Sequence, residues 1–338
     1  WRLVAGIGIG VELVTIDAYV TEFAPPGIRG RAIAVNQSIQ FLAVPAVAFA
    51  CWALVPRAPF GIAGWRWVIL IGAAASMAVW LIRARLPESP RWLVAHGRAA
   101  EAEAIVARLE AAVVAATGRP LPPPAQGRPV AAPPPGRGDL SEIFRPPYRR
   151  RTIMLVVFNI FQAIGFYGFG NWAPSLIAAR GLGVTRSLGY AFLIALAWPL
   201  GPLVCAAFAD RFERKHQIVA AAVLTAALGL AFAGQNAPAV LIALGVGITL
   251  SNALLSYAYH AYQAELFPTR VRASAVGFVY SWSRLSTVFS SLVIGALLAT
   301  AGTGGVFVFI AGAMAVVVIA VGLFGPRTRG ATLDAISA

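Results

Sequence analysis

Charged residues are scarce in this sequence. Only 12% of its 338 residues are Asp, Glu, Lys or Arg, whereas 59% are hydrophobic. A soluble globular domain carries about 25% charged residues, so this composition argues against a chain that folds in water. Because the charges are few, long apolar stretches remain uninterrupted, and the length of those stretches indicates the class of protein.

Three further shortages exclude function classes. The two cysteines, Cys51 and Cys205, both lie in apolar stretches, so neither a disulfide framework nor a cysteine metal site is expected. Three scattered histidines make no nucleophile–base set and no metal cluster, so the sequence predicts neither an enzyme nor a cofactor. The chain has no G-x-x-x-x-G-K-S/T motif, which argues against an ATP-driven pump unless a partner chain supplies the motor.

The apolar stretches are long enough to cross a lipid bilayer. A spanning helix needs about 20 apolar residues, and a membrane β-barrel would show short alternating segments instead. The sequence therefore predicts an all-α integral membrane protein. The predicted spans are residues 2–21, 32–55, 66–82, 152–178, 187–209, 217–234, 239–264, 273–299 and 304–324.

The basic residues are distributed unequally between alternate loops. If 22–31 is cytoplasmic, the loops on its side of the membrane carry most of the arginines, and the loops on the other side carry few. This asymmetry follows the positive-inside rule. The formal net charge of +14 thus reports membrane topology, and nucleic acid is not an expected partner.

A short motif occurs twice. Tyr19–Arg29 and Tyr262–Arg272 share the pattern Y-x-x-E-x-x-P-x-x-x-R, and both lie between two predicted spans. Many transporters are built from structural repeats that leave such weak similarity. The second copy follows the fourth predicted span of the C-terminal half, whereas the first copy follows the first predicted span of the N-terminal half. Equal halves would therefore require three further helices before Trp1.

A long hydrophilic loop divides the two halves. Residues 97–116 are predicted to form an amphipathic surface helix, and the Pro-rich stretch 118–138 a linker without regular structure. The expected organisation has four parts: the remainder of an N-terminal lobe (1–85), a cytoplasmic loop (86–151), a C-terminal lobe (152–325) and a cytoplasmic tail (326–338).

These motifs resemble the major facilitator superfamily. Besides the repeat, the resemblance rests on "PESPRWL" at Pro87–Leu93, "DRFERK" at Asp210–Lys215 and the tail "GPRTRGATLDAIS" that begins at Gly325. It covers all nine predicted spans and implies that nine of twelve helices are present. It points to the sugar-porter-like branch, and within it to members similar to nicotinate transporters and synaptic vesicle proteins. It also implies a monomer in the bacterial cytoplasmic (inner) membrane.

The sequence departs from the sugar-porter pattern at several positions. The usual loop glycine is Glu213, and the usual acidic residue after Pro326 is Arg327. A tryptophan typical of hexose porters is Leu255, which lowers the expectation of a hexose substrate.

The resemblance also implies an intracellular latch of opposite charges that closes when the transporter faces outward. The alternative is that the arginines only fix the topology of the loops, which would not explain the matched acidic residues. The predicted gate residues are Glu22, Arg29, Glu88, Arg91, Asp210, Arg211, Arg214, Glu265 and Arg272.

Ionisable residues inside spans are costly and therefore candidate functional groups. Arg284, near the middle of its span, suits a carboxylate of the substrate or of another helix. Glu12, Arg2 and His260 are the candidates for proton coupling. Arg2 is included by resemblance, and Glu12 could equally be a structural partner of another helix.

Uncharged polar residues suggest a cavity lining. Asn252 and Tyr259 lie on one polar stripe of a predicted helix, which could instead be a helix contact. Gln162 and Asn171 would face the same cavity only if their helix breaks, which Gly165, Gly168, Gly170 and Pro174 would allow. Gln37 matches a sugar-porter binding position.

The sequence therefore predicts a secondary transporter that works by alternating access. We expect proton-coupled symport of a small carboxylate such as nicotinate or another aromatic acid. A sugar or polyol porter is the alternative. A further alternative is a non-transporting membrane receptor or a non-functional fragment.

Overall fold

A computed structural model describes residues 29–83, 86–95, 97–121, 140–208, 212–267 and 271–328 of the 338-residue chain. It divides into two compact units, which we describe separately. Unit 1 comprises residues 1–36 and 69–133, and unit 2 comprises residues 37–68 and 134–338.

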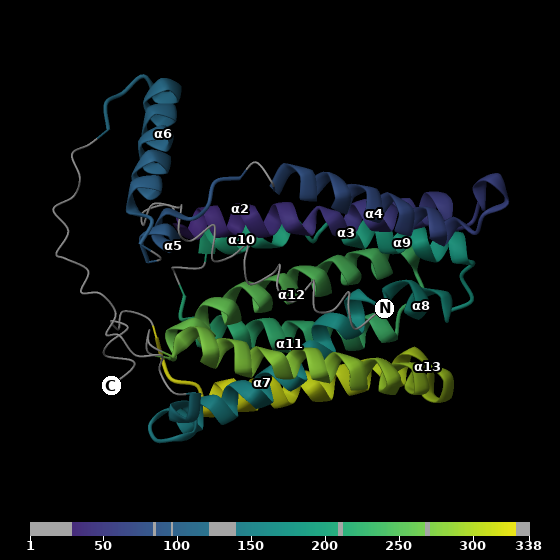
Figure 1. Ribbon diagram of the computed structural model, residues 1–338. Helices are drawn as coiled ribbons and strands as arrows, with labels where there is room; N and C mark the ends of the chain where they lie inside the picture. Colours follow the sequence, from purple (N-terminus) through teal and green to yellow (C-terminus); the bar gives the residue numbers. More distant parts are fainter. Residues whose placement is uncertain are drawn as a thin grey trace. The chain divides into compact units, whose positions relative to one another are not determined.

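All regular secondary structure of the described residues is helical, which confirms the predicted fold class (Figure 1). The α-helices and 3₁₀-helices are α2 (Arg29–Phe41), α3 (Ala43–Leu54), η1 (Pro59–Gly61), α4 (Gly64–Arg83), α5 (Pro90–Ala95), α6 (Ala99–Thr117), η2 (Leu140–Phe144), α7 (Tyr148–Gly170), α8 (Ala173–Ala178), α9 (Val184–Ala195), α10 (Leu200–Phe208), α11 (Arg214–Ala233), α12 (Pro238–Glu265) and α13 (Arg272–Phe324).

Within the described ranges, seven helical segments are long and apolar enough to cross a membrane. They match the predicted spans from 32–55 onward, and the predicted span 2–21 lies outside the described residues. These segments are Ala34–Leu54, Gly64–Arg83, Tyr148–Gly170, Val184–Cys205, Arg214–Ala233, Pro238–Gln263 and Ser274–Phe324.

The last of these segments contains two spans. Its backbone leaves the helical conformation at Gly302, where φ is 65° and ψ is −164°, a region open to glycine alone. A methyl group on Gly168 of α7 would touch both Ile294, at 3.1 Å, and Ile310, at 3.3 Å. A straight helix would hold residues 294 and 310 about 24 Å apart, so α13 folds back at Gly302, as the predicted spans 273–299 and 304–324 require.

Helix α6 is the main described element of unit 1. The sequence predicted it at 97–116, and it ends at Thr117 and is capped by Gly118, whose φ of +64° permits the left-handed cap. An ion pair at its start joins Arg98 to Glu101 over 2.6 Å. Most of the predicted linker lies outside the described residues.

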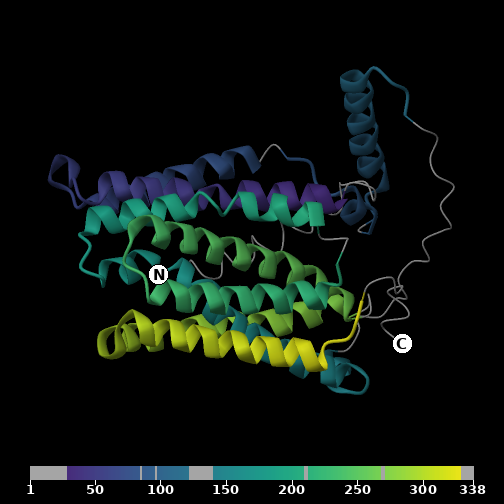
Figure 2. The same cartoon turned by 180° about the vertical axis from the view of Figure 1, so that it is seen from behind.

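The core of unit 2 is packed between α7, α11, α12 and α13. Phe169, Phe232 and Phe307 come from three of these helices, and their rings meet with centroids 5.2 to 6.3 Å apart. Figures 1 and 2 show these four helices side by side from opposite directions. The unit therefore has a continuous apolar interior that can support a polar site.

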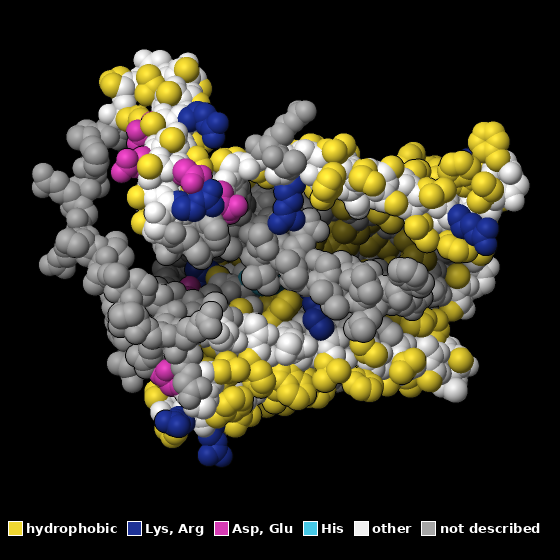
Figure 3. Space-filling model, in the orientation of Figure 1, with side chains coloured by type: hydrophobic (Ala, Val, Ile, Leu, Met, Phe, Trp, Pro, Cys, Tyr) yellow, Lys and Arg dark blue, Asp and Glu magenta, His cyan; other side chains and the backbone are white. Residues whose placement is uncertain are grey.

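Apolar side chains also cover the outside of unit 2. Leu292 and Leu323 of α13 each expose 71% of their surface, and Val308 exposes 64%. Figure 3 shows hydrophobic side chains along the flank formed by these helices. Water would penalise so large an apolar surface, whereas lipid acyl chains would not, so this flank faces the bilayer.

Candidate substrate site and cytoplasmic cluster

Arg284 lies at the centre of an aromatic cluster that joins α7 and α13. Its Nη1 donates a hydrogen bond to the hydroxyl of Tyr167 over 2.6 Å, and its Nη2 donates to the hydroxyl of Tyr280 over 2.7 Å. The guanidinium carbon lies 5.7 Å and 5.0 Å from the centroids of the same two rings. Both contacts fix the guanidinium in place without neutralising its charge.

No carboxylate pairs with Arg284 in the part of the chain that the structure describes. The ion pairs there are Arg98–Glu101 and Arg214–Glu265. A guanidinium has five N–H donors, and only two hydrogen bonds are described for this one. Because the side chain is also exposed within its unit, it can receive a further acceptor.

Tyr259 and His260 of α12 extend the cluster. The two rings stack with centroids 4.2 Å apart, and His260 lies 5.8 Å from the ring of Tyr280. The Nδ1 of His260 lies 2.7 Å from the carbonyl oxygen of Ser256, so Nδ1 carries a proton and donates it. In a neutral imidazole, Nε2 is then the acceptor for the Tyr259 hydroxyl, 3.3 Å away. The structure thus brings together three of the predicted residues, namely Arg284, Tyr259 and His260.

Two predicted amides are buried in unit 2. Gln162 of α7 is 3% exposed, and Asn252 of α12 is fully buried. Neither Nδ2 nor Oδ1 of Asn252 has a hydrogen-bond partner in the structure. Buried polar groups are normally paired, so Asn252 is an uncompensated polar position in the apolar interior.

The structure does not bring Asn171 next to Gln162. Helix α7 runs without a break through Gly165 and Gly168 and ends at Gly170, and α8 begins at Ala173, so the helix is interrupted after Gly170, beside Pro174, and not at the earlier glycines. Asn171 is the residue after the last helical one and is exposed, whereas Gln162 is buried. The glycines instead allow close packing, because a methyl group on Gly165 would lie 2.7 Å from Met314.

Other predicted site residues stay predictions. Gln37 is a partly exposed residue of α2, and no described contact joins it to the Arg284 cluster. Arg2 and Glu12, the other proton-coupling candidates, lie outside the described residues.

One pair of the predicted gate forms in unit 2. Arg214, at the start of α11, donates from Nε to Oε1 of Glu265, at the end of α12, over 2.7 Å. Each side chain is 23% exposed. Glu265 of the second repeat copy therefore binds Arg214, the second arginine of the D-R-F-E-R-K loop.

The remaining gate residues are not tested by this geometry. Glu88 is exposed and accepts a 3.4 Å hydrogen bond from the backbone N–H of Ser89. Glu22, Asp210 and Arg211 lie outside the described residues, as do the side chains of Arg29, Arg91 and Arg272.

Three side chains near the Arg214–Glu265 pair bind the segment that follows α13. Glu213 accepts the backbone N–H of Thr328 over 2.9 Å. Lys215 donates to the carbonyl of Gly325, also over 2.9 Å, and Tyr262 donates to the carbonyl of Pro326 over 2.8 Å. Glu213, which replaces the usual loop glycine, thus has a structural partner that sequence reasoning did not anticipate.

Sequence reasoning also missed Tyr280 and Arg180. Tyr280 precedes Arg284 by four residues on one helix, a spacing that brings side chains together, so the pattern could have indicated it. Arg180 donates to the carbonyls of Phe232 and Ala233, at the end of α11, over 2.7 and 3.2 Å. Partial burial lowers the pKa of this guanidinium. Its contacts cross more than 50 residues, and no local pattern signals them.

Known proteins resemble the chain along its whole length. The family model described as "Sugar (and other) transporter" matches residues 1–338. YyaJ of Bacillus subtilis (strain 168), whose name describes a metabolite transport protein, is 32% identical over 97% of this chain and 72% of its own length. The chain belongs to the sugar (and other) transporter family.

Further relatives agree with this membership. The niacin transporter NiaP of Acinetobacter baylyi is 26% identical over 99% of this chain and 74% of its own length. The xylose transporter XylE of Escherichia coli, in a partially occluded inward-open conformation, superposes with a TM-score of 0.75 over 98% of this chain and 71% of that chain, at 20% identity. The superposition confirms the expected major facilitator fold.

Family membership determines the general activity. The chain is a multi-pass membrane transporter for small metabolites or sugars and not an enzyme, as the sequence predicted. Bacterial relatives and the apolar helices place it in the inner membrane.

Proposed function

We propose that this transporter carries a small organic carboxylate and couples its movement to protons. The observation that supports the proposal is the arginine of the Arg284 cluster, which is oriented by two phenols and has no described carboxylate partner. A membrane protein keeps such a charge at high cost. A substrate carboxylate would compensate it through charge-assisted hydrogen bonds.

The aromatic surroundings favour a flat, aromatic acid. Tyr167, Tyr280 and Tyr259 offer ring faces and hydroxyls close to the guanidinium. A carboxylate on the guanidinium would leave an attached ring among these phenols, where offset stacking is favourable. The relative NiaP bears the name of a niacin transporter, and nicotinate has this combination of carboxylate and ring.

Proton coupling is proposed for the Tyr259–His260 pair. Imidazole titrates near neutral pH when unperturbed, and the Nε2 of His260 accepts a hydrogen bond from Tyr259. Protonation of Nε2 would reverse that bond, so that Nε2–H donates to the Tyr259 hydroxyl, and would add a second positive charge beside Tyr280 and Arg284. An anionic substrate would be favoured by that charge, which links proton and substrate binding.

A sugar or polyol is the second candidate. The buried amides Gln162 and Asn252 supply hydrogen-bonding groups suited to hydroxyls, and both polar atoms of Asn252 are unpaired. In that case Arg284 would have a structural role.

Uptake of labelled nicotinate and labelled glucose into proteoliposomes, with an inward proton gradient, tests the proposal. We expect gradient-dependent nicotinate uptake, and Arg284→Ala should lower its kcat/KM by about 30-fold or more, because hydrogen bonds between charged partners contribute about 2 kcal/mol or more. The matched control is Arg186→Ala, an exposed arginine at the start of α9. Glucose uptake that is insensitive to Arg284→Ala would contradict the proposal and support the sugar porter.

A further inference from the structure

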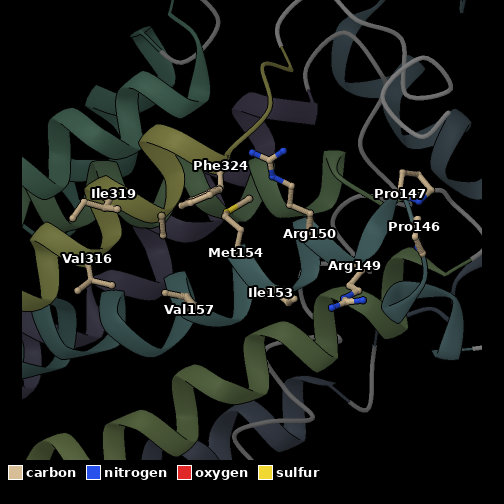
Figure 4. Close-up of a pocket in the computed structure, with 11 residues that line it drawn as sticks. Pro146, Pro147, Arg149, Arg150, Ile153, Met154, Val157, Val316, Ile319 and Phe324 are labelled. Atoms are coloured by element: carbon tan, nitrogen blue, oxygen red, sulfur yellow. The ribbon is translucent and has the colours of Figure 1, made fainter.

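A groove of about 530 Å³ opens on the flank of unit 2 where α7 begins and α13 ends. It lies between the first three turns of α7 and the last three turns of α13, near the predicted cytoplasmic side (Figure 4). Its lining residues are Pro146, Pro147, Arg149, Arg150, Ile153, Met154, Val157, Val316, Ile319, Ala320 and Phe324.

The floor and walls of the groove are apolar. Met154 and Ala320 are buried beneath it, whereas Ile153, Ile319 and Phe324 expose 54%, 53% and 48% of their surface. These residues belong to membrane-spanning segments. Because acyl chains surround such segments, a hydrocarbon chain is the occupant that this lining suits.

Two arginines lie at the mouth of the groove. Arg149 and Arg150 are both exposed, and the guanidinium of Arg150 lies 5.5 Å from the ring centroid of Phe324. Figure 3 shows basic side chains gathered at this end of the unit, over η2 and the start of α7. In the part of the chain described, neither arginine is among the ion-paired residues.

The neighbouring Arg151 differs from them. It donates to the carbonyl of Leu266 over 3.2 Å and lies over the ring of Tyr148. Its charge is therefore held inside the unit, whereas Arg149 and Arg150 line the groove and point in different directions from the start of α7 (Figure 4). Guanidinium groups bind phosphate oxygens in pairs of hydrogen bonds.

We propose that this groove binds one acidic phospholipid of the cytoplasmic leaflet. Arg150, beside Phe324, would bind the phosphodiester, and Arg149 would add positive charge at the same end of the groove. One acyl chain would follow Ile153, Val157 and Ile319. Basic pockets between spanning helices on the cytoplasmic side are suited to such headgroups. The inference goes beyond the proposed function, because the groove is lined by none of the residues of the Arg284 cluster.

Native mass spectrometry of the detergent-purified full chain tests the site. Phosphatidylglycerol and phosphatidylcholine with identical acyl chains are added, and the retained lipid is counted. We expect one phosphatidylglycerol to be retained preferentially. Each arginine near a lipid surface contributes about a factor of five, so Arg149→Gln with Arg150→Gln should lower that preference about 25-fold. Arg149→Lys with Arg150→Lys, which keeps both charges, should retain most of it.

The matched control is Arg57→Gln with Arg66→Gln, two exposed arginines on the predicted opposite side of the membrane. An equal loss in this control would overturn the proposal, since it would indicate attraction by net charge alone. Equal retention of phosphatidylcholine would also overturn it.

A second variant separates the groove from its arginines. Ile319→Trp fills the groove at a half-exposed position and leaves both guanidinium groups in place. We expect it to weaken retention of phosphatidylglycerol, and soluble glycerophosphate should not displace the lipid. Unchanged retention, or displacement by glycerophosphate at the concentration of the lipid, would show a free phosphate site and refute a lipid groove.

Discussion

Two arginines of unit 2, Arg214 and Arg284, hold their charges in opposite ways. Arg214 is bound to the carboxylate of Glu265, so its charge is compensated within the protein. Arg284 is bound to two phenols, which orient the guanidinium but leave it cationic. The first arrangement fits a contact that holds helix ends together, and the second fits a site for an anion. The partner of an arginine is thus more informative than its position in the sequence.

The strongest test of this comparison removes the positive charge of Arg284 in one variant and the planar guanidinium in another. Arg284→Gln removes the charge, and we expect kcat/KM for an anionic substrate to fall about 100-fold. Arg284→Lys keeps the charge but offers no planar fork, so a fall of about tenfold is expected. Uptake kinetics in proteoliposomes measure both values. Equal effects of the two variants would show that charge is not the property that matters.

The orientation of the guanidinium should matter less than its charge. Tyr167→Phe combined with Tyr280→Phe removes both described hydrogen-bond acceptors of Arg284 while keeping the rings. Because the two phenols act on the substrate only through the orientation of the guanidinium, we expect KM to rise about tenfold, the equivalent of about one hydrogen bond to a charged group, with a smaller change in kcat. Tyr190→Phe, a tyrosine of α9, is the control and should leave KM unchanged. A rise of KM in the control as well would refute a specific role for the two phenols.

The Arg214–Glu265 pair should show a modest, mutual effect. Both side chains are mostly buried, and Oε2 of Glu265 has no hydrogen-bond partner in the structure. Arg214→Gln and Glu265→Gln should each destabilise the protein, and the double variant should lose less than the sum. We expect a coupling free energy of about 1 kcal/mol, measured by thermal unfolding in detergent. Strictly additive losses would mean that the contact contributes no stability.

The smallest effect is expected for Arg98 and Glu101 of unit 1, which are both exposed. The hydrogen bond from Arg98 lowers the pKa of Glu101, so any stabilisation is present above the ordinary carboxyl pKa and is lost as the pH falls through the lowered one. Solvent screens such a pair. We therefore expect Arg98→Ala to leave the unfolding temperature unchanged at pH 7 and at pH 4. A clear drop at pH 7 alone would contradict this.

The sequence was sufficient to predict the spans because each is a local property of about 20 residues. Hydropathy located α7, α11 and α12, and it left residues 300–303 between the two halves of α13, a stretch that includes Gly302. The family resemblance also placed Arg214 and Glu265 among nine predicted gate residues, and the structure brings these two into contact. Charge type and topology determine such contacts, and both can be deduced from the chain.

The partners of the site residues could not be predicted in the same way. Tyr167 and Arg284 are 117 residues apart, and their contact depends on how α7 packs against α13. The expected break lies after Gly170, between α7 and α8, and not at Gly165 or Gly168, which pack against Met314 and Ile310 within α7. Glycine in a spanning helix has two uses, bending and close approach, and only the neighbouring helices determine which applies.

The reversal at Gly302 has a consequence for how the protein is made. Residues 299–305 contain no charged side chain, and the helical hydrogen bonding is interrupted over very few residues. The translocation machinery therefore has almost no hydrophilic chain to move across the membrane between these two spans. We expect the two halves of α13 to enter the bilayer together, as one preformed hairpin, during biosynthesis.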